Sequence, residues 1–248
     1  MKSRKNLINK ISTSRWSKEE SDYHQAYSAL FEKYPEKFFN NAFFNTTRVD
    51  FARSLFKIKI YELVKNCKGS IAELGTFRGN GLMLFYHMML ALEPTNYEDK
   101  ILAFDTFEGF RNIDKKNDKN ISPKDFSNTD YDFLKKLTEI NRLNDVIKHI
   151  PKVHLIKGDA TKTIPQYVKK NKSLLLKILY LDCPIYKPTL AALEYLYPLV
   201  VKGGIIVFDE IGMEKWAGET LAFKKYFKNN VKLKKFSFEP SASYFIKE

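Results

Sequence analysis

The sequence has 248 residues and 44% hydrophobic side chains, enough for one large α/β domain with a buried core. It lacks the roughly 18 unbroken apolar residues of a membrane helix and the apolar run of a secretory signal, so we expect a cytoplasmic protein without a membrane partner. The net charge of +13 allows an anionic partner, but the lysines are scattered and no nucleic-acid-binding motif accompanies them, which disfavours nucleic acid.

The chain begins with a polar and aromatic segment. A helical patch at 23–34 predicts that residues 1–47 form an N-terminal helical extension. Its aromatic side chains can cover either a substrate pocket or a neighbouring subunit of a homo-oligomer. The candidates for that role are Phe38, Phe39, Phe43 and Phe44.

From residue 48 onward, predicted helices and strands alternate. A helix at 48–66 ends before Gly69, and later helices are expected at 80–92, 131–143, 164–171, 189–199 and 219–228. Strands are expected at 70–74, 100–104, 153–157, 173–181 and 205–208, and a hairpin at 231–238 and 242–246. This alternation predicts one α/β domain over 48–248, with a doubly wound, mostly parallel sheet and an antiparallel hairpin strand at its carboxyl end.

The segment at 111–130 interrupts the alternation. It is rich in Asn, Asp, Lys and Ser and offers almost no apolar side chain as an anchor. Long loops inside compact domains are usually lids or disordered segments. We therefore expect a candidate lid at 111–130.

The first strand of the domain runs into a glycine-containing loop. In doubly wound sheets, ligands bind at the carboxyl ends of the strands, and glycine lets the backbone approach a ligand closely. The next helix offers free N–H groups to a carboxylate, and Glu73 can accept from an ammonium. These features suit the amino-acid end of S-adenosylmethionine, although a tight strand–helix turn is the simpler explanation of the glycines alone. The residues concerned are Glu73, Gly75, Arg78, Gly79, Asn80 and Gly81.

Acidic residues also follow the next two strands. Asp105, with Thr106 and Phe107 after it, stands where an acidic side chain can bind both ribose hydroxyls of a nucleoside. Asp159 can accept from an adenine amino group, and Ala160 leaves room for the ring. The combination of three strand ends predicts a nucleoside-shaped cofactor site, whereas any one of these residues alone can be structural.

A second set of carboxylates follows the fourth and fifth strands. Asp182 ends the central strand, and Asp209 and Glu210 end the next one. Carboxylates that converge repel one another unless a hard divalent cation with oxygen ligands, such as Mg²⁺, lies between them. Such an ion can lower the pKa of a substrate hydroxyl. The alternative is that these residues are helix caps or further contacts to the cofactor, which we expect Asp182 to touch in either case.

Several segments in the same order resemble the macrocin O-methyltransferase family, over residues 48–247. They are 73–81, 105–110, 182–194, 203–210 and 218–220. The resemblance implies a Rossmann-like class I methyltransferase fold, S-adenosyl-L-methionine as methyl donor, Mg²⁺ dependence and a mobile lid at 111–130. It also implies a small-molecule substrate methylated on a sugar hydroxyl, in a nucleotide-activated deoxysugar or a glycan.

The sequence departs from the family at one position. The family carries Asp-x-Asp at the end of the central strand, and the resemblance implies that the first Asp binds metal and the second accepts a proton. Here Asp182 is followed by Pro184 in the second place, and proline can do neither. Another group is then the base, or metal activation suffices, or catalysis is impaired. Tyr186 and Glu219 join Asp182 as the candidate catalytic residues.

Two alternatives to a sugar O-methyltransferase stay open. The first is a methyltransferase for another small molecule, such as a phenolic acceptor, which would share the fold and the cofactor. The second is a homologue that binds the cofactor but has lost turnover through Pro184.

Overall fold

The computed structural model describes residues 18–39 and 41–248, in two compact units, Met1–Phe51 and Ala52–Glu248. The boundary falls inside a helix, α4 (Arg48–Val64), four residues after the boundary predicted from the sequence. None of the helices in the described part of the chain is long and apolar enough to cross a membrane.

The first unit contains the predicted helical extension. Helices α2 (Lys18–Lys33) and α3 (Pro35–Phe39) are followed by a short 3₁₀ helix, η2 (Ala42–Asn45). Phe38 is buried and packs edge-on against Tyr27, Phe31 and Phe44. Residues 1–17 of the predicted extension and the side chain of Phe39 lie outside what the structure describes.

The second unit is built on a sheet whose seven described strands have the order β3-β2-β1-β4-β5-β7-β6. The strands are β1 (Ser70–Leu74), β2 (Ile101–Asp105), β3 (Val153–Lys157), β4 (Leu176–Leu181), β5 (Val200–Phe208), β6 (Lys234–Phe236) and β7 (Glu239–Ile246). The first five are parallel and β7 is antiparallel to β5 and β6. The doubly wound sheet with an antiparallel carboxyl-terminal hairpin is therefore confirmed.

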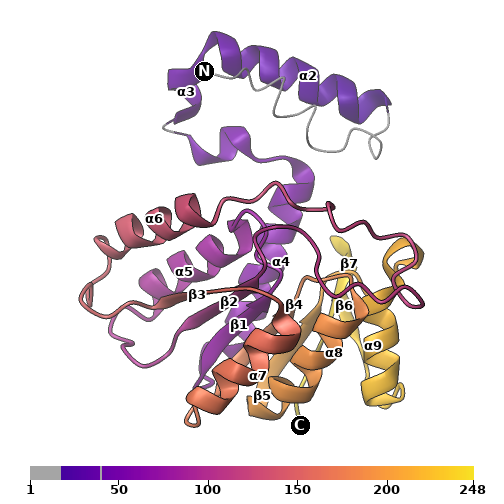
Figure 1. The fold of residues 1–248 in the computed structure, drawn as a ribbon. Helices are drawn as coiled ribbons and strands as arrows, with labels where there is room; N and C mark the ends of the chain where they lie inside the picture. Colours follow the sequence, from indigo (N-terminus) through magenta and orange to yellow (C-terminus); the bar gives the residue numbers. More distant parts are fainter. Residues whose placement is uncertain (1–17, 40) are drawn as a thin grey trace. The chain divides into compact units, whose positions relative to one another are not determined.

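Helices cover both faces of this sheet (Figure 1). Side chains of α4, α5 (Asn80–Leu92) and α6 (Tyr131–Arg142) share one apolar core, and those of α7 (Ala160–Lys170), α8 (Tyr186–Tyr195) and α9 (Ala217–Phe227) share the other. Successive strand residues alternate between the two cores, as Ile71 and Ala72 do in β1. The strands are apolar on both faces because each face is covered by helices.

Several elements differ from their predicted bounds, and three of them lie close to the site. Helix α7 begins at Ala160 rather than 164, because the Asp159 carboxylate accepts from the Thr161 N–H and caps the helix there. Helix α8 begins at Tyr186 and ends at Tyr195, before a 3₁₀ turn at Tyr197–Leu199. Strand β5 begins at Val200, so Gly203 and Gly204 lie inside it rather than before it.

The strand order reverses at β1, which has β2 on one side and β4 on the other. Ligands of doubly wound folds bind outside the carboxyl ends of the strands at this reversal. The loops that follow β1, β2, β4 and β5 therefore meet at one edge of the sheet.

Candidate active site

The loop after β1 makes a tight turn that depends on Gly75 and Gly79. Gly75 has a φ of 86°, and a Cβ there would overlap the backbone carbonyl oxygen of Asp182 after β4. Gly79, with a φ of 85°, precedes the first residue of α5. The predicted glycine loop therefore lies against the residue predicted to link the cofactor and the metal.

Asp105 holds this loop from the end of β2. Its Oδ2 accepts from the backbone N–H groups of Thr76 and Phe77, each at 2.8 Å, and its Oδ1 accepts from that of Phe107 at 2.7 Å. Burial raises the pKa of this carboxyl group, and these N–H donors oppose the rise. Sequence analysis predicted the carboxylate as a ribose acceptor; the structure adds that it ties the loops after β1 and β2 together.

Both carboxylate oxygens of Asp159 accept hydrogen bonds from neighbouring residues. Its Oδ1 accepts from the N–H and the hydroxyl of Thr161, and its Oδ2 accepts from the Asn112 amide at 2.7 Å. These contacts give it the role of a helix cap that also holds the loop at 111–130. The adenine contact predicted for Asp159 and Ala160 stays a prediction.

Glu73 belongs to β1 and is 2% exposed. Its Oε1 is 3.9 Å from Nζ of Lys57, and its buried Oε2 accepts no hydrogen bond from the described residues. Burial raises the pKa of Glu73 to about 8, against the opposing charge of Lys57. An amino-acid ammonium is a charged donor of the kind that Oε2 lacks, so this residue fits the proposed end of the cofactor.

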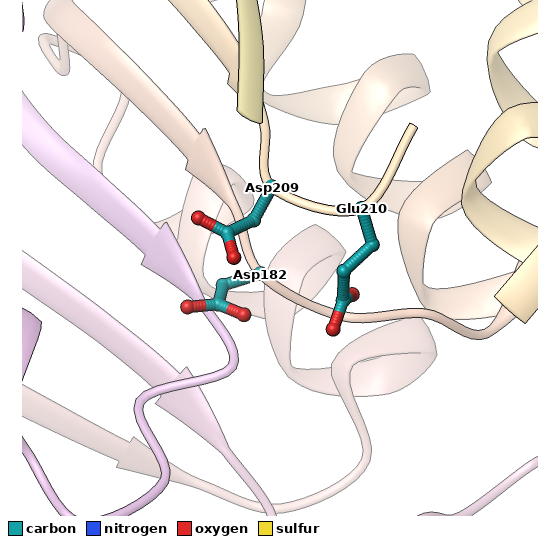
Figure 2. A group of neighbouring side chains, drawn as sticks. All are labelled: Asp182, Asp209 and Glu210. Carbon is teal, nitrogen blue, oxygen red and sulfur yellow. The ribbon is translucent and has the colours of Figure 1, made fainter. Parts of the chain in front are cut away.

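Asp182, Asp209 and Glu210 form an acidic cluster after β4 and β5 (Figure 2). One oxygen from each lies within 4.8 Å of the others. Burial raises the pKa of Asp182 to about 7, and the charge of Asp209 adds to this. Three hard oxygen donors this close form a donor set that suits Mg²⁺. The structure thus brings together the carboxylates singled out from the sequence.

Two cations from α4 reach the same region, and sequence analysis missed both. Arg53 Nη2 lies 2.7 Å from Asp209 Oδ2, and Asp209 Oδ1 accepts from the Tyr180 hydroxyl at 2.5 Å. Lys57 Nζ stands 3.2 Å from the centroid of the Tyr180 ring. Their spacing of four residues places them on one face of a helix, but nothing in it indicates what that face meets.

The two candidate bases have different surroundings. Glu219 is fully buried, and its Oε2 accepts from the backbone N–H of Glu210 at 2.9 Å. Burial and the charge of Glu210 raise its pKa well above the usual value. The catalytic role proposed for Glu219 stays a prediction. Tyr186 donates its backbone N–H to Asp118 of the loop at 111–130.

The loop at 111–130 is irregular, as predicted, but it has more anchors than its sequence suggested. Arg78, which was predicted to contact the cofactor, is exposed and donates to the carbonyl oxygen of Asn128 in this loop. The Phe126 ring meets Phe77, Phe110 and Trp216 edge-on. The loop therefore lies over the glycine turn and the start of α9.

Fold and site together define a class I methyltransferase, since the doubly wound sheet carries a glycine turn after β1, an acidic residue after β2 and a closing antiparallel β7. The sequence profile of the macrocin O-methyltransferase family, TylF, matches residues 46–239. The chain belongs to this family, and it is an O-methyltransferase.

Solved structures agree. The calicheamicin methyltransferase CalS11 has 27% identity, with 94% of each chain covered and a TM-score of 0.86. The apo structure of CalS11, described as a TDP-rhamnose 3'-O-methyltransferase, gives a TM-score of 0.79 at 27% identity, covering 94% of this chain and 96% of that one. The O-methyltransferase NovP, 18% identical over 79% of each chain with a TM-score of 0.62, shares the fold. Comparison with curated proteins gave no significant match.

Proposed function

We propose that this protein transfers a methyl group from S-adenosylmethionine to a sugar hydroxyl, in a nucleotide-activated sugar or a glycan. The observation that supports the proposal most is the close contact between the cofactor loop after β1 and Asp182 of the acidic cluster. Gly75 of the cofactor loop lies so close to the Asp182 carbonyl that a side chain would not fit between them. A methyl donor on that loop would therefore stand beside the acidic cluster.

The cofactor supplies an electrophilic methyl group on a sulfonium. Glu73 would accept from its ammonium, and the N–H groups of Asn80 and Gly81 in the first turn of α5 would be donors to its carboxylate. Asp105, with Thr106 and Phe107, would bind the nucleoside. The Oδ1 of Asp105 accepts from the Phe107 N–H, and a carboxylate oxygen has a second lone pair that a ribose hydroxyl would use.

The acidic cluster would hold Mg²⁺ through Asp182, Asp209 and Glu210, and such an ion lowers the pKa of a bound hydroxyl. In the metal-free protein the pKa of Asp182 is raised to about 7, so binding of such an ion near neutral pH would displace its proton. Pro184 has no carboxylate, so Asp182 is the acidic side chain that the segment after β4 would contribute to metal binding. We propose that the loop at 111–130 closes over the reaction and excludes water.

The sugar acceptor is proposed from the family and from the TDP-rhamnose 3'-O-methyltransferase activity of CalS11, which aligns over 94% of this chain. The test is a panel of nucleotide-activated deoxysugars and phenolic acceptors, each incubated with S-adenosylmethionine in Mg²⁺ or in EDTA. Mass spectrometry should find one methyl group added to the sugar, and only in the presence of Mg²⁺. Methylation of phenols alone would establish the alternative acceptor class.

Pro184 favours one second candidate, a protein that binds the cofactor without turning it over. Calorimetry would then show S-adenosylmethionine binding while no acceptor is methylated. Turnover that EDTA abolishes and Mg²⁺ restores would exclude this second candidate.

A further inference from the structure

Helix α4 places two cationic side chains near the acidic cluster, and they differ in their exposure to solvent. Lys57 is 7% exposed and is held between Glu73 and the face of the Tyr180 ring. The Arg53 side chain is 46% exposed, although the Asp209 side chain that it binds is 4% exposed. The Arg53 guanidinium is exposed enough to be hydrated when it leaves Asp209, whereas the buried Lys57 ammonium is not.

Arg53 occupies an atom that a metal would need. Both oxygens of Asp209 have donors, Tyr180 on Oδ1 and Arg53 on Oδ2. The Tyr180 hydroxyl carries no positive charge, so it does not repel an incoming ion as a cation would. Arg53 carries a full positive charge, which the Asp209 carboxylate stabilises further by raising the guanidinium pKa.

A divalent cation and a guanidinium on one carboxylate repel each other. This repulsion is absent in the metal-free protein. There, the positive charge of Arg53 reduces the electrostatic repulsion between the carboxylates of Asp209 and Asp182. We propose that Arg53 is an exchangeable counter-cation: it holds Asp209 while the cluster is empty and leaves Asp209 when the metal binds. This inference rests on the proposed metal site, and it makes Arg53 a residue that sets metal affinity.

The test compares Mn²⁺ binding by the full chain and by Arg53→Gln, without acceptor, from the electron paramagnetic resonance signal of free Mn²⁺. Removing the competitor should lower Kd by about tenfold or more, the equivalent of one charge-assisted hydrogen bond. Lys59→Gln is the matched control, because Lys59 lies on the same helix but pairs with the exposed Glu62. It should leave Kd unchanged. Metal-free Arg53→Gln should also melt at a lower temperature than Lys59→Gln.

A Kd for Arg53→Gln that is unchanged or higher would overturn the inference, because Arg53 would then support Asp209 in the loaded site. A second measurement needs no glutamine variant to fold. In the wild type, the side-chain N–H resonance of Arg53, assigned with Arg53→Lys, should move toward that of a solvated guanidinium on saturation with Mg²⁺; a resonance that stays in place would also overturn it.

The failure of the metal site itself has a different signature. If neither protein binds Mn²⁺, the inference falls together with the metal, while methyl transfer that resists EDTA would leave the rest of the proposed function standing. Binding by Arg53→Gln but not by the wild type would be the strongest form of the expected result.

Discussion

The Oδ1 of Asp118, in the middle of the loop at 111–130, accepts a hydrogen bond of 2.9 Å from the backbone N–H of Tyr186, the first residue of α8. Helix α8 has no side-chain cap of its own, so a residue 68 positions away supplies one. Asp118 fits there because the facing residue is Gly218, whose Cβ would overlap this same oxygen. The loop is thereby fastened between the starts of α8 and α9.

Asp118→Ala should release the loop. Loss of the cap should lower the free energy of unfolding by about 1 kcal/mol, and hydrogen exchange should speed up at 111–130. If the loop closes over the reaction, kcat/KM should fall as well. Gly218→Ala should mimic these effects from the opposite side of the contact.

Asp125→Ala is the control for this fastening, because its carboxylate caps a turn inside the same loop through Ser122. It should leave exchange near Tyr186 unchanged. Equal effects of Asp118→Ala and Asp125→Ala would show that the contact with α8 has no special weight.

Asp105→Ala should weaken S-adenosylmethionine binding and destabilise the protein together. The substitution leaves three backbone N–H groups without their acceptor, a loss of about 3 kcal/mol in the free energy of unfolding. Calorimetry measures the affinity and thermal melting the stability. An unchanged affinity for the cofactor would contradict the assignment of the nucleoside end of the site to Asp105.

Glu73 should link cofactor binding to protons. Its pKa rises from 4.5 to about 8 on folding, so the folded state holds the proton more tightly than the unfolded state. Its contribution to stability is complete below 4.5 and is lost as the pH rises through about 8. An ammonium bound beside it would favour the charged form, and binding at neutral pH should release a proton.

Calorimetry in two buffers of different ionisation enthalpy counts the protons released on S-adenosylmethionine binding. Glu73→Gln should abolish the release and flatten the decline in stability between pH 4.5 and about 8. Glu108→Gln, at an exposed carboxylate, should do neither. Release that survives in Glu73→Gln would assign the proton to another group.

Asp182→Asn should separate stability from activity. The neutral amide relieves the repulsion from Asp209 that helps raise the Asp182 pKa to about 7, so the metal-free protein should melt at a higher temperature above that pH. Mg²⁺-dependent turnover should fall sharply, because the substitution removes the charge of a proposed ligand of the ion. Full activity of the variant in chelator would exclude a metal role for Asp182.

The sequence was sufficient to predict what depends on local pattern. Strands β1 and β3 and helix α5 have their predicted bounds, and the strand-end rule correctly gathered Asp182, Asp209 and Glu210. Short apolar runs between glycine turns specify such elements, and the parallel sheet then aligns their ends at one edge.

The parts that sequence analysis missed depend on contacts between distant segments. Arg53 and Lys57 belong to an ordinary helical pattern, and their partners lie far away in sequence, as in the Arg53–Asp209 pair. Asp118 was one polar residue among many in a loop, and its value as a cap exists only where that loop meets α8. Asp159 was predicted as a contact for adenine, and the structure adds that its carboxylate caps α7.

The edge-on contact between Trp216 and Phe126, with ring centroids 6.1 Å apart, gives the protein an optical reporter of its own. Phe126 belongs to the loop at 111–130 and Trp216 to the short turn before α9, so opening of the loop would change the surroundings of the indole. The sequence has one other tryptophan, Trp16, which Trp16→Phe would silence. Stopped-flow emission from Trp216 could then time each catalytic cycle without a chemical label.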